Sequence, residues 1–259
     1  MCQASFARAA AKFGVVCVSV ADVRSATGAI PATLNYDPQE ETQLLYGEGV
    51  EIFDHQGEWL KIGAVEQPEF SHNRRWESYP GWVKKDAILK IKRPPDMKFV
   101  VKTKSSRIHD RPDFKSSFLP VSMGTKLDVT GDSKKGFWKV RKVDGDTGWI
   151  AMDEVRLLTP PLPESFTRKM ITDSASELLG DPYFWGGRSA NLPDLANQVT
   201  AVDCSGLVNL AYRVAGIDIP RDSYEQYQKS RKIKKEELKT GDLIFSGPKD
   251  DPNKIFKSR

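Results

Sequence analysis

The feature that most restricts the fold of this chain is an internal repeat within its first 158 residues. Each copy has a run of alternating residues, a polar turn, a segment in which Trp is followed by Lys and then Ile or Val (Trp-Leu-Lys-Ile in the first copy, Trp-Lys-Val in the second), another turn and a Gly-Trp-[Val/Ile] segment. These segments are residues 49–53, 57–62 and 81–83 in the first copy, and residues 124–129, 136–140 and 148–150 in the second. Short alternating runs separated by Gly, Asp and Pro are typical of small barrels or sandwiches. We therefore expect two all-β units, with the two tryptophans of each copy bracketing a small core and glycines allowing tight turns beside them.

Proline-rich segments divide the chain around this repeat. Arg93-Pro94-Pro95-Asp96 is a natural joint between the two copies, and Thr159-Pro160-Pro161-Leu162-Pro163 is a stiff segment after the second. The predicted divisions are a loosely held leader (1–14), a first unit (15–91), a second unit (98–158), a linker (159–164) and a C-terminal domain (165–259). The first unit carries an insertion over residues 65–78. An insertion of this kind in a small barrel is more often functional than structural.

Composition argues against several classes of protein. Hydrophobic residues make up 39% of the chain, charged residues 29%, and the net charge is only +4, so we expect no nucleic-acid partner. No apolar run approaches the roughly 18 residues that span a bilayer. Arg8 and Lys12 interrupt the N-terminal stretch, which therefore does not resemble a signal peptide, so the cytoplasm is the default location and export stays open. The three cysteines, Cys2, Cys17 and Cys204, are too few and too widely spaced for a disulfide framework or a zinc site.

The clearest chemical signal lies in residues 202–207. Cys204 follows Asp203 and opens a run with apolar residues at helical spacing, which Gly216 and Pro220 bring to an end. A thiol on the first turn of a helix faces unpaired backbone N–H groups and the positive end of the helix dipole. Both favour the thiolate, which is the nucleophilic form. The alternative is a small buried cysteine that packs the start of a helix.

Further elements are expected on both sides of this cysteine. A helix that ends at Gly180 is predicted to present one apolar face, formed by Phe166, Met170, Ile171, Ala175, Leu178 and Leu179. Residues 188–201 form a polar loop, and a short helix is predicted over residues 223–230. Thr240-Gly241-Asp242 is then a turn into a strand over residues 243–245.

Three segments of the C-terminal part together resemble motifs of the NlpC/P60 cysteine peptidases. They are Tyr183-Phe184-Trp185-Gly186-Gly187, Asp203-Cys204-Ser205-Gly206 and Pro220-Arg221-Asp222-Ser223. Nearly the whole chain resembles members of that family with paired bacterial SH3-type domains. The resemblance implies two small all-β SH3-like barrels followed by an α+β, papain-like domain. It also implies a thiol endopeptidase that hydrolyses γ-D-glutamyl–L-diamino-acid bonds in peptidoglycan stem peptides or muropeptides, in cell-wall turnover or recycling. No metal or organic cofactor is implied.

The resemblance assigns the catalytic roles. Cys204 would attack the amide carbonyl, and Tyr183 would direct its hydroxyl toward the oxyanion that forms there. Trp185 would lie against the substrate, while Gly186 and Gly187 would serve the backbone geometry of the site. The alternative for both aromatic residues is plain packing in a core.

The resemblance also assigns substrate contacts, at Asp203, Ser205, Asp222, Ser223, Glu48 and Tyr79. In the relatives with paired SH3-type domains these positions hold a stem peptide with a free N-terminal L-alanine amine, a cation that requires a carboxylate partner. Glu48 and Tyr79 would come from the first SH3-type unit and close one end of the groove. The alternatives are an N-cap role for Asp222 and a solvated turn position for Glu48.

The sequence departs from the family pattern at the general base. The family places a histidine on a strand after a turn like Gly241-Asp242, whereas here Ile255-Phe256 precedes Lys257 and no histidine follows His109. Lys257 stands near the expected position of the histidine, but its ammonium, with a pKa near 10, is a poor proton shuttle at neutral pH. His72 of the insertion is left as a remote substitute for the general base. We therefore expect the C-terminal domain to be incomplete, which puts the activity of this chain in question. The alternatives are a non-catalytic protein that binds peptidoglycan fragments, and an SH3-type module that binds a protein partner.

Overall fold

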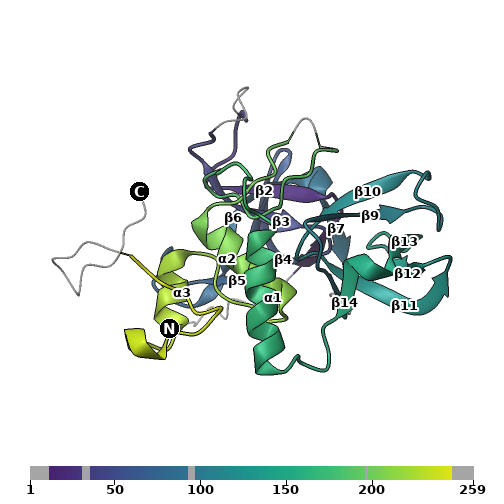
Figure 1. The fold of residues 1–259 in the computed structure, drawn as a ribbon. Coiled ribbons are helices and arrows are strands. Elements are labelled where there is room, and N and C mark those ends of the chain that lie inside the picture. Colours follow the sequence, from purple (N-terminus) through teal and green to yellow (C-terminus); the bar gives the residue numbers. More distant parts are fainter. Residues whose placement is uncertain (1–11, 31–35, 93–96, 196–197, 247–259) are drawn as a thin grey trace, which may run out of the picture.

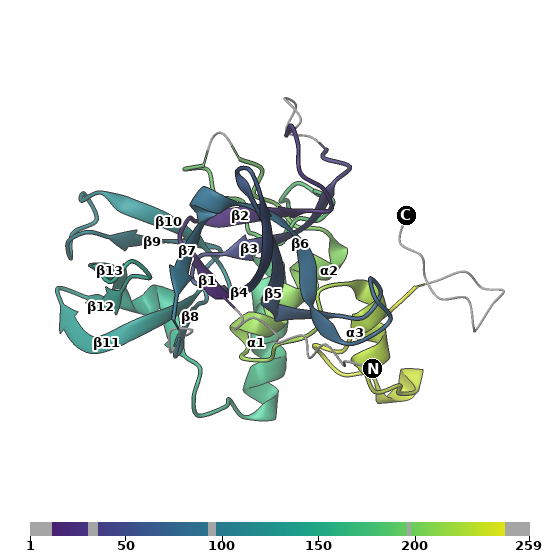
Figure 2. The ribbon, with the colours of Figure 1, turned by 180° about the vertical axis from the view of Figure 1, so that it is seen from behind.

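The computed structural model describes residues 12–30, 36–92, 97–195 and 198–246 (Figure 1). Most of the predicted leader, the predicted joint at 93–96 and the segment around Lys257 lie outside the described residues. In Figures 1 and 2 the first sheet and the second sheet lie side by side, and three α-helices lie on one side of the first sheet. None of the helices in the described part is both long enough and apolar enough to cross a bilayer.

The first sheet has seven antiparallel strands in the order β3-β2-β6-β5-β4-β1-β7. Its strands are β1 (Lys12–Val16), β2 (Val20–Arg24), β3 (Glu40–Leu45), β4 (Gly49–Gln56), β5 (Trp59–Glu69), β6 (Glu77–Lys84) and β7 (Ile88–Ile91). A 3-10 turn, η1 (Lys85–Ala87), precedes the last strand. All of these elements except the start of β1 fall within the first predicted unit.

The second sheet repeats this arrangement in the order β10-β9-β13-β12-β11-β8-β14. Its strands are β8 (Phe99–Val101), β9 (Ser105–His109), β10 (Phe118–Ser122), β11 (Lys126–Lys134), β12 (Phe137–Arg141), β13 (Thr147–Ala151) and β14 (Val155–Leu157). The turn η2 (Met152–Glu154) precedes the last strand, as η1 does in the first sheet. The equivalent strand order confirms the internal repeat. Among the described residues, neither sheet closes by pairing its two outer strands.

The prediction that two tryptophans bracket each core is only partly confirmed, because one tryptophan of each copy is buried or packs at a core, Trp59 at 7% exposed and Trp138 against the second core, and the other does not. The repeat contains four of them, Trp59, Trp82, Trp138 and Trp149. Strand alternation points Val83 and Ile150 into the cores, so Trp82 and Trp149, one residue earlier, are only half-buried on the other face. The core of the first sheet is aliphatic apart from Tyr79, and the half-buried Trp138 packs at the edge of the second core.

The strand glycines also differ from the expected tight turns. Gly81 and Gly148 lie inside β6 and β13, where a Cβ atom would approach Val23 Cγ1 to 2.3 Å and Ile108 Cγ2 to 2.5 Å. Their missing side chains allow close packing with the neighbouring strand in both copies. Gly136 does adopt the predicted turn conformation, with φ of 80°.

The insertion over residues 65–78 extends the β5–β6 hairpin. Register is regular up to the pair Ala64 and Tyr79, shifts at a bulge, and resumes with Pro68 opposite Ser78. A bulge redirects side chains and bends the strand. The extended hairpin therefore reaches past the first sheet, and its tip contacts the C-terminal part of the chain.

The C-terminal part contains α1 (Glu164–Ser176), α2 (Cys204–Val214), α3 (Ser223–Lys229) and the turn η3 (Lys235–Glu237). The helix ending near Gly180, the cysteine helix and the short third helix agree with prediction. Ile171 and Leu178 are buried, but Phe166 and Leu179 are 64% and 79% exposed, so the predicted apolar face of the first helix is only partly covered. Phe166 lies on the first turn and Leu179 beyond the last, outside the stretch of α1 that packs on α2.

The strand predicted over residues 243–245 does not form. A strand requires a backbone partner, and no described segment pairs with this one. The segment is held by side chains instead. Tyr212 Oη donates to Gly241 O at 2.6 Å, Arg168 pairs with Asp242 at 2.7 Å, and the Phe245 ring packs edge-on against Tyr227.

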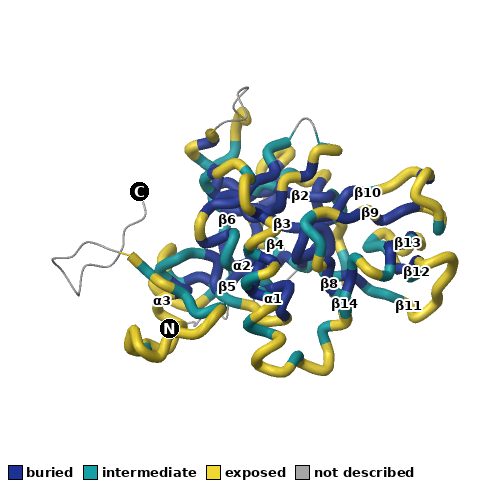
Figure 3. Tube along the Cα trace, viewed as in Figure 1, coloured by how far each residue is buried: buried dark blue, intermediate teal, exposed yellow. Residues whose placement is uncertain are grey.

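A shared core joins the two sheets to the helices. Its buried side chains include Leu45 from the first sheet, Met123 from between β10 and β11 of the second, and Leu178, Leu210 and Val214 from the C-terminal part. Figure 3 shows buried chain concentrated where these parts meet, with the exposed chain at the hairpin tips and around α3. The first sheet, the second sheet and the C-terminal part therefore pack around one common core rather than as separate domains.

A buried ion cluster lies beside this shared core. Glu48, which is 1% exposed, pairs with Arg188 at 2.9 Å and with Arg213 of α2 at 3.1 Å. Arg213 also pairs with Glu66 of the hairpin bulge at 2.8 Å and donates to Gly124 O of the second sheet at 2.8 Å. Burial alone would raise the pKa of Glu66, but Arg213 and Lys126 together lower it to about 2. Glu66 is therefore ionised at neutral pH, and the cluster connects all three parts.

Removal of the Glu48 charge tests this cluster. Glu48→Gln leaves two buried guanidinium groups without their shared anion, so we expect the free energy of unfolding to fall by about 3–5 kcal/mol. Urea unfolding followed by tryptophan fluorescence measures the change. Glu58→Gln is the matched control, because Glu58 forms an exposed pair with Lys84 and should change stability by less than about 1 kcal/mol. Equal effects of the two substitutions would contradict the role given to Glu48.

Candidate active site

Cys204 is the first residue of α2, and it is exposed. Asp203 caps the helix, since its Oδ1 accepts from the backbone N–H of Gly206 at 2.6 Å. The helix ends in a Schellman motif, in which Gly216 N donates to Arg213 O and Ile217 N donates to Tyr212 O. The thiol is therefore placed at the positive end of a well-capped helix, as the sequence predicted.

Glycines bring the segment around residue 187 close to the start of this helix. A Cβ atom on Gly206 would lie 2.2 Å from Gly187 O, and one on Gly187 would lie 2.5 Å from Ala201 O. Gly186 has a φ of 77°, a conformation that side chains disfavour, and its Cα packs against Glu40. The predicted backbone role of Gly186 and Gly187 is confirmed.

A buried arginine holds the loop around the nucleophile. Arg221 is fully buried and binds both carboxylate oxygens of Asp203, with distances of 3.1 and 2.8 Å. It also donates to Ser205 Oγ at 2.9 Å and to Thr42 Oγ1 of the first sheet at 2.7 Å. Burial alone would raise the pKa of Asp203, but Arg221 lowers it. Asp203 and Ser205 were predicted as substrate contacts. The hydrogen bonds of their side chains are instead made within the protein, where they position the start of α2.

Tyr183 lies near Cys204. Its side chain is 63% exposed, and its backbone forms an isolated bridge with Val202, two residues before Cys204. Partial burial, with Asp203 and Cys204 nearby, raises the pKa of the Tyr183 hydroxyl. The group therefore stays protonated at neutral pH and available as a donor. Trp185, two residues on, is half-buried in the same segment.

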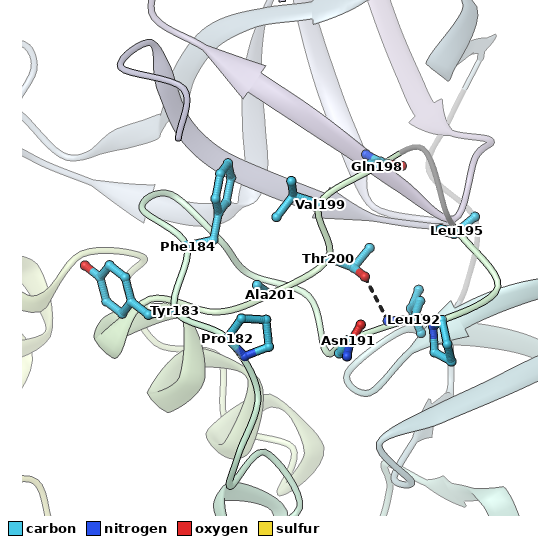
Figure 4. A pocket seen from close by; sticks show the side chains of 11 residues that line it. Pro182, Tyr183, Phe184, Asn191, Leu192, Leu195, Gln198, Val199, Thr200 and Ala201 are labelled. Carbon is cyan, nitrogen blue, oxygen red and sulfur yellow. Dashed lines mark hydrogen bonds between the residues drawn. The ribbon is translucent and has the colours of Figure 1, made fainter. Parts of the chain in front are cut away.

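A cavity of about 490 Å³ opens beside Tyr183 (Figure 4). None of its lining side chains is charged; they are Pro182, Tyr183, Phe184, Asn191, Leu192, Pro193, Leu195, Gln198, Val199, Thr200 and Ala201. Thr200 Oγ1 accepts from Leu192 N at 2.8 Å, which holds the two sides of the loop together. In Figure 4 the Tyr183 hydroxyl points away from the other lining residues. The cavity is therefore an uncharged space on one side of Tyr183.

Carboxylates gather where the β5–β6 hairpin meets the start of α3. Tyr79 Oη donates to Asp222 Oδ2 at 3.1 Å and lies 3.4 Å from Glu41 Oε2. Burial raises the pKa of Asp222 to about 6; Arg221 opposes this shift, while Glu225 and Asp203 add to it. The structure thus brings together Tyr79 and Asp222, two predicted site residues from distant parts of the chain. Ser223 follows Asp222 as the half-buried first residue of α3.

Two predicted alternatives are wrong. Asp222 is the N-cap residue of α3, but its side chain makes no capping hydrogen bond, because Tyr79 and Arg221 engage it instead. Glu48 is not a solvated turn residue, because it is buried in the ion cluster. For the same reason its carboxylate is not exposed to a substrate in the groove. The first sheet brings Glu41 rather than Glu48 to this end of the site.

Sequence reasoning missed Glu41 and Arg221 as site residues. Glu41 gave no signal, since it stands in a run of polar residues at the start of a strand. Arg221 stood inside the quoted Pro-Arg-Asp-Ser segment, but nothing in a single sequence predicts that it binds Asp203, 18 residues earlier. Among the described residues no hydrogen bond joins a histidine to Cys204, and His72, the remote substitute for the base, pairs instead with Glu69.

The family model described as NlpC/P60 family matches residues 180–256. The chain carries an NlpC/P60 domain. The structure also aligns with a crystal structure of an NlpC/P60 family protein from Bacillus cereus ATCC 10987. That comparison gives a TM-score of 0.74 at 22% identity and covers 88% of this chain and 81% of the other. The likeness shows that the fold is shared.

Two curated relatives extend the match beyond the NlpC/P60 domain. Both are named gamma-D-glutamyl-L-lysine dipeptidyl-peptidase, one from Bacillus cereus (strain ATCC 10987 / NRS 248) and one from Bacillus subtilis (strain 168). Each is 30% identical over 79% of this chain. The chain spans 59% and 63% of their lengths, about three fifths. A third relative, peptidoglycan endopeptidase RipB of Mycobacterium tuberculosis, is 44% identical over 78 residues.

The raised pKa of Asp222 predicts a pH-dependent cost to stability. A carboxyl whose folded pKa is raised to about 6 disfavours the folded state once pH rises above the unfolded value near 4. Asp222→Asn should therefore raise the free energy of unfolding at pH 8 by about 1–3 kcal/mol, and the gain should shrink as pH falls toward 4. Urea unfolding at several pH values measures it. Asp54→Asn, at a site 70% exposed, is the control and should show no such trend.

Proposed function

We propose that this chain acts on peptidoglycan stem peptides as a cysteine peptidase of the NlpC/P60 type, with Cys204 as the nucleophile. The proposed bond is γ-D-glutamyl–L-diamino acid, in a peptide or muropeptide with a free N-terminal amine. Support comes from the names of the 30% identical relatives and from the site itself. The observation that carries it is an exposed thiol at the start of α2, with the Tyr183 hydroxyl near enough for Cys204 to affect its pKa and with carboxylates gathered at the start of α3.

The proposed chemistry follows from the groups around the thiol. The Cys204 thiolate attacks the amide carbonyl carbon and forms a C–S bond. The resulting oxyanion is stabilised by first-turn N–H groups of α2 and by the protonated hydroxyl of Tyr183. The C–N bond then breaks, and the leaving amine takes a proton from solvent water. A second water molecule hydrolyses the thioester, which releases the carboxylic acid and restores the Cys204 thiol. No metal or organic cofactor has a role in these steps.

The acidic end of the site supports recognition of a free amine. Glu41 and Asp222 are partly exposed, and Tyr79 Oη lies between them. Arg221 is the nearby guanidinium, but it is bound on both donor nitrogens by Asp203. A primary ammonium placed here would replace water as the partner of two carboxylates in a partly dry setting, where charged hydrogen bonds are strongest. Substrates with a blocked amine would leave these charges unpaired.

We also interpret each seven-stranded sheet as an SH3-type unit, with the predicted limits 15–91 and 98–158. The repeated strand order and the short turn before the last strand support this interpretation. The first unit would then supply the end wall of the groove through Glu41 and Tyr79. The second unit would brace the NlpC/P60 domain through Gly124 and Lys126. A cytoplasmic location remains a prediction from the sequence.

A cleavage assay tests the proposed activity. The chain is incubated with L-Ala-γ-D-Glu-L-Lys and with the diaminopimelate form, and mass spectrometry follows release of L-Ala-D-Glu. We expect release by the unmodified chain, none by Cys204→Ala, and a fall of about tenfold or more for Tyr183→Phe. The N-acetylated tripeptide should be cut poorly. Cleavage that persists in Cys204→Ala would refute the role of the thiol.

A second function, binding without cleavage, is favoured by one observation. The three histidines of the sequence are His55, His72 and His109, and none is hydrogen-bonded to Cys204 in the described structure. A protein of this kind would hold the same peptide in the same groove. Calorimetry with Cys204→Ala separates the two functions. If Cys204→Ala and the unmodified chain both bind the dipeptide, and the unmodified chain cleaves no tripeptide, the result would favour the second function, binding without cleavage.

A further inference from the structure

The tip of the β5–β6 hairpin places a histidine among the carboxylates of the site. His72 Nδ1 lies 3.1 Å from Glu69 Oε2, and His72 Nε2 lies 3.9 Å from Glu41 Oε2. The imidazole packs edge-on against Tyr79, with ring centroids 5.1 Å apart. The His72 side chain is 35% exposed, so the ring can exchange protons with solvent. It therefore lies beside Glu41, one of the two carboxylates proposed to bind an ammonium, and beside Tyr79, whose hydroxyl lies between them.

Negative charge is in excess at this end of the site. Glu69 and Glu225 are 1% and 0% exposed, and each has one carboxylate oxygen without a hydrogen-bond partner in the described structure. Glu69 lies at the end of β5, and Glu225 accepts from the backbone N–H of Ser71 at the hairpin tip. Buried carboxylates with unused acceptors favour a nearby cation. Either a ligand ammonium or the histidine itself can supply that charge.

We propose that His72 determines ligand specificity here: its protonated ring competes with a substrate ammonium for Glu41 and the adjoining carboxylates. When neutral, the ring leaves Glu41 and Asp222 to the ligand and packs on Tyr79. When protonated, it pairs with Glu69 and Glu41 and supplies the charge that the ligand would bring. The inference rests on the proposed recognition of a free amine and adds to it the residue that sets the conditions for binding.

The charged groups that face His72 come from several elements. Glu69 is on β5, Glu41 on β3, Glu77 and Tyr79 on β6, and Asp222 before α3. The hydrogen bond to Glu69 raises the pKa of His72; partial burial opposes it, and the charges of Glu69, Glu41 and Asp222 support it. Protonation of His72 as pH falls should thus weaken ammonium binding. Protonation of Asp222 near pH 6 acts in the same direction.

Competition between a proton and a ligand is reciprocal. If protonated His72 excludes the ammonium, bound ligand must lower the pKa of His72 by the amount that protonation weakens binding. Where exclusion is complete, affinity falls about tenfold for each pH unit below the His72 pKa. A histidine that only supports the hairpin would show neither effect. This reciprocity separates the two roles without any need for turnover.

The experiment uses the full chain with Cys204→Ala and the dipeptide L-Ala-γ-D-Glu. Calorimetry from pH 5.5 to 8 gives the affinity, with N-acetyl-L-Ala-γ-D-Glu as the ligand that lacks the ammonium. NMR titration of the His72 ring gives its pKa with and without dipeptide. We expect affinity to fall with pH, and dipeptide but not its N-acetyl form to lower the His72 pKa.

Three substitutions test the assignment. His72→Gln should flatten the pH dependence and leave only the part due to Asp222. Glu69→Gln should lower the His72 pKa and move the loss of affinity to lower pH. His55→Gln is the matched control, because His55 is 76% exposed on β4 beside Asp54, and it should behave as the parent chain. Melting temperatures confirm that each variant is folded, and His72→Phe replaces His72→Gln if the latter is not.

Two outcomes refute the inference separately from the proposed function. Dipeptide binding with the same pH dependence in His72→Gln as in the parent chain would overturn the role of His72 and leave amine recognition intact. An unchanged His72 pKa on saturation with dipeptide would likewise overturn the role of His72 and leave amine recognition intact. Absence of dipeptide binding at every pH would overturn the proposed amine recognition, and the inference with it.

Discussion

The carboxylate of Glu48 is the interaction on which the arrangement of the whole molecule depends. It lies between Arg188, which precedes the nucleophile loop, and Arg213 on the helix that carries Cys204. Arg213 continues to Gly124 of the second sheet and to Glu66 of the hairpin bulge. Buried ions tolerate few alternative geometries, because each must keep its partner or bear the full cost of desolvation. The carboxylate of Glu48 therefore fixes the positions of the two sheets and the helix α2 relative to one another.

The hairpin insertion shows how this fixed arrangement reaches the site. Its bulge supplies Glu66, which is anchored by Arg213. Its tip supplies Ser71, which donates to Glu225 of α3, and His72, which pairs with Glu69 at the end of β5. The anchor is buried and the tip is partly exposed. A site built on such an anchored hairpin holds its geometry better than one on a free loop. This is why an element of the first sheet can place side chains beside α3, which lies more than 100 residues later in the chain.

The sequence predicted what depends on local pattern and missed what depends on distant partners. The repeat, the helix beginning at Cys204 and its end at Gly216 follow from spacing, capping and glycine chemistry. The choice of Glu41 over Glu48 does not, since both are acidic residues of one sheet, and only the packing of Arg188 and Arg213 decides which is buried. The strand expected over residues 243–245 failed for a similar reason. Its apolar pattern was suitable, but strand structure also requires a partner.

The balance of charge around Cys204 gives the groove a direction. Toward the hairpin, carboxylates outnumber the cations available to them, because Arg221 is committed to Asp203. Toward Tyr183, the adjoining cavity has no charged side chain in its lining. A ligand with an ammonium at one end would thus gain from placing that end beside the hairpin, since the reverse orientation would leave the carboxylates unpaired. The orientation of the proposed peptide, with its free amine at Glu41 and Asp222 and its scissile bond at the thiol, follows from this asymmetry.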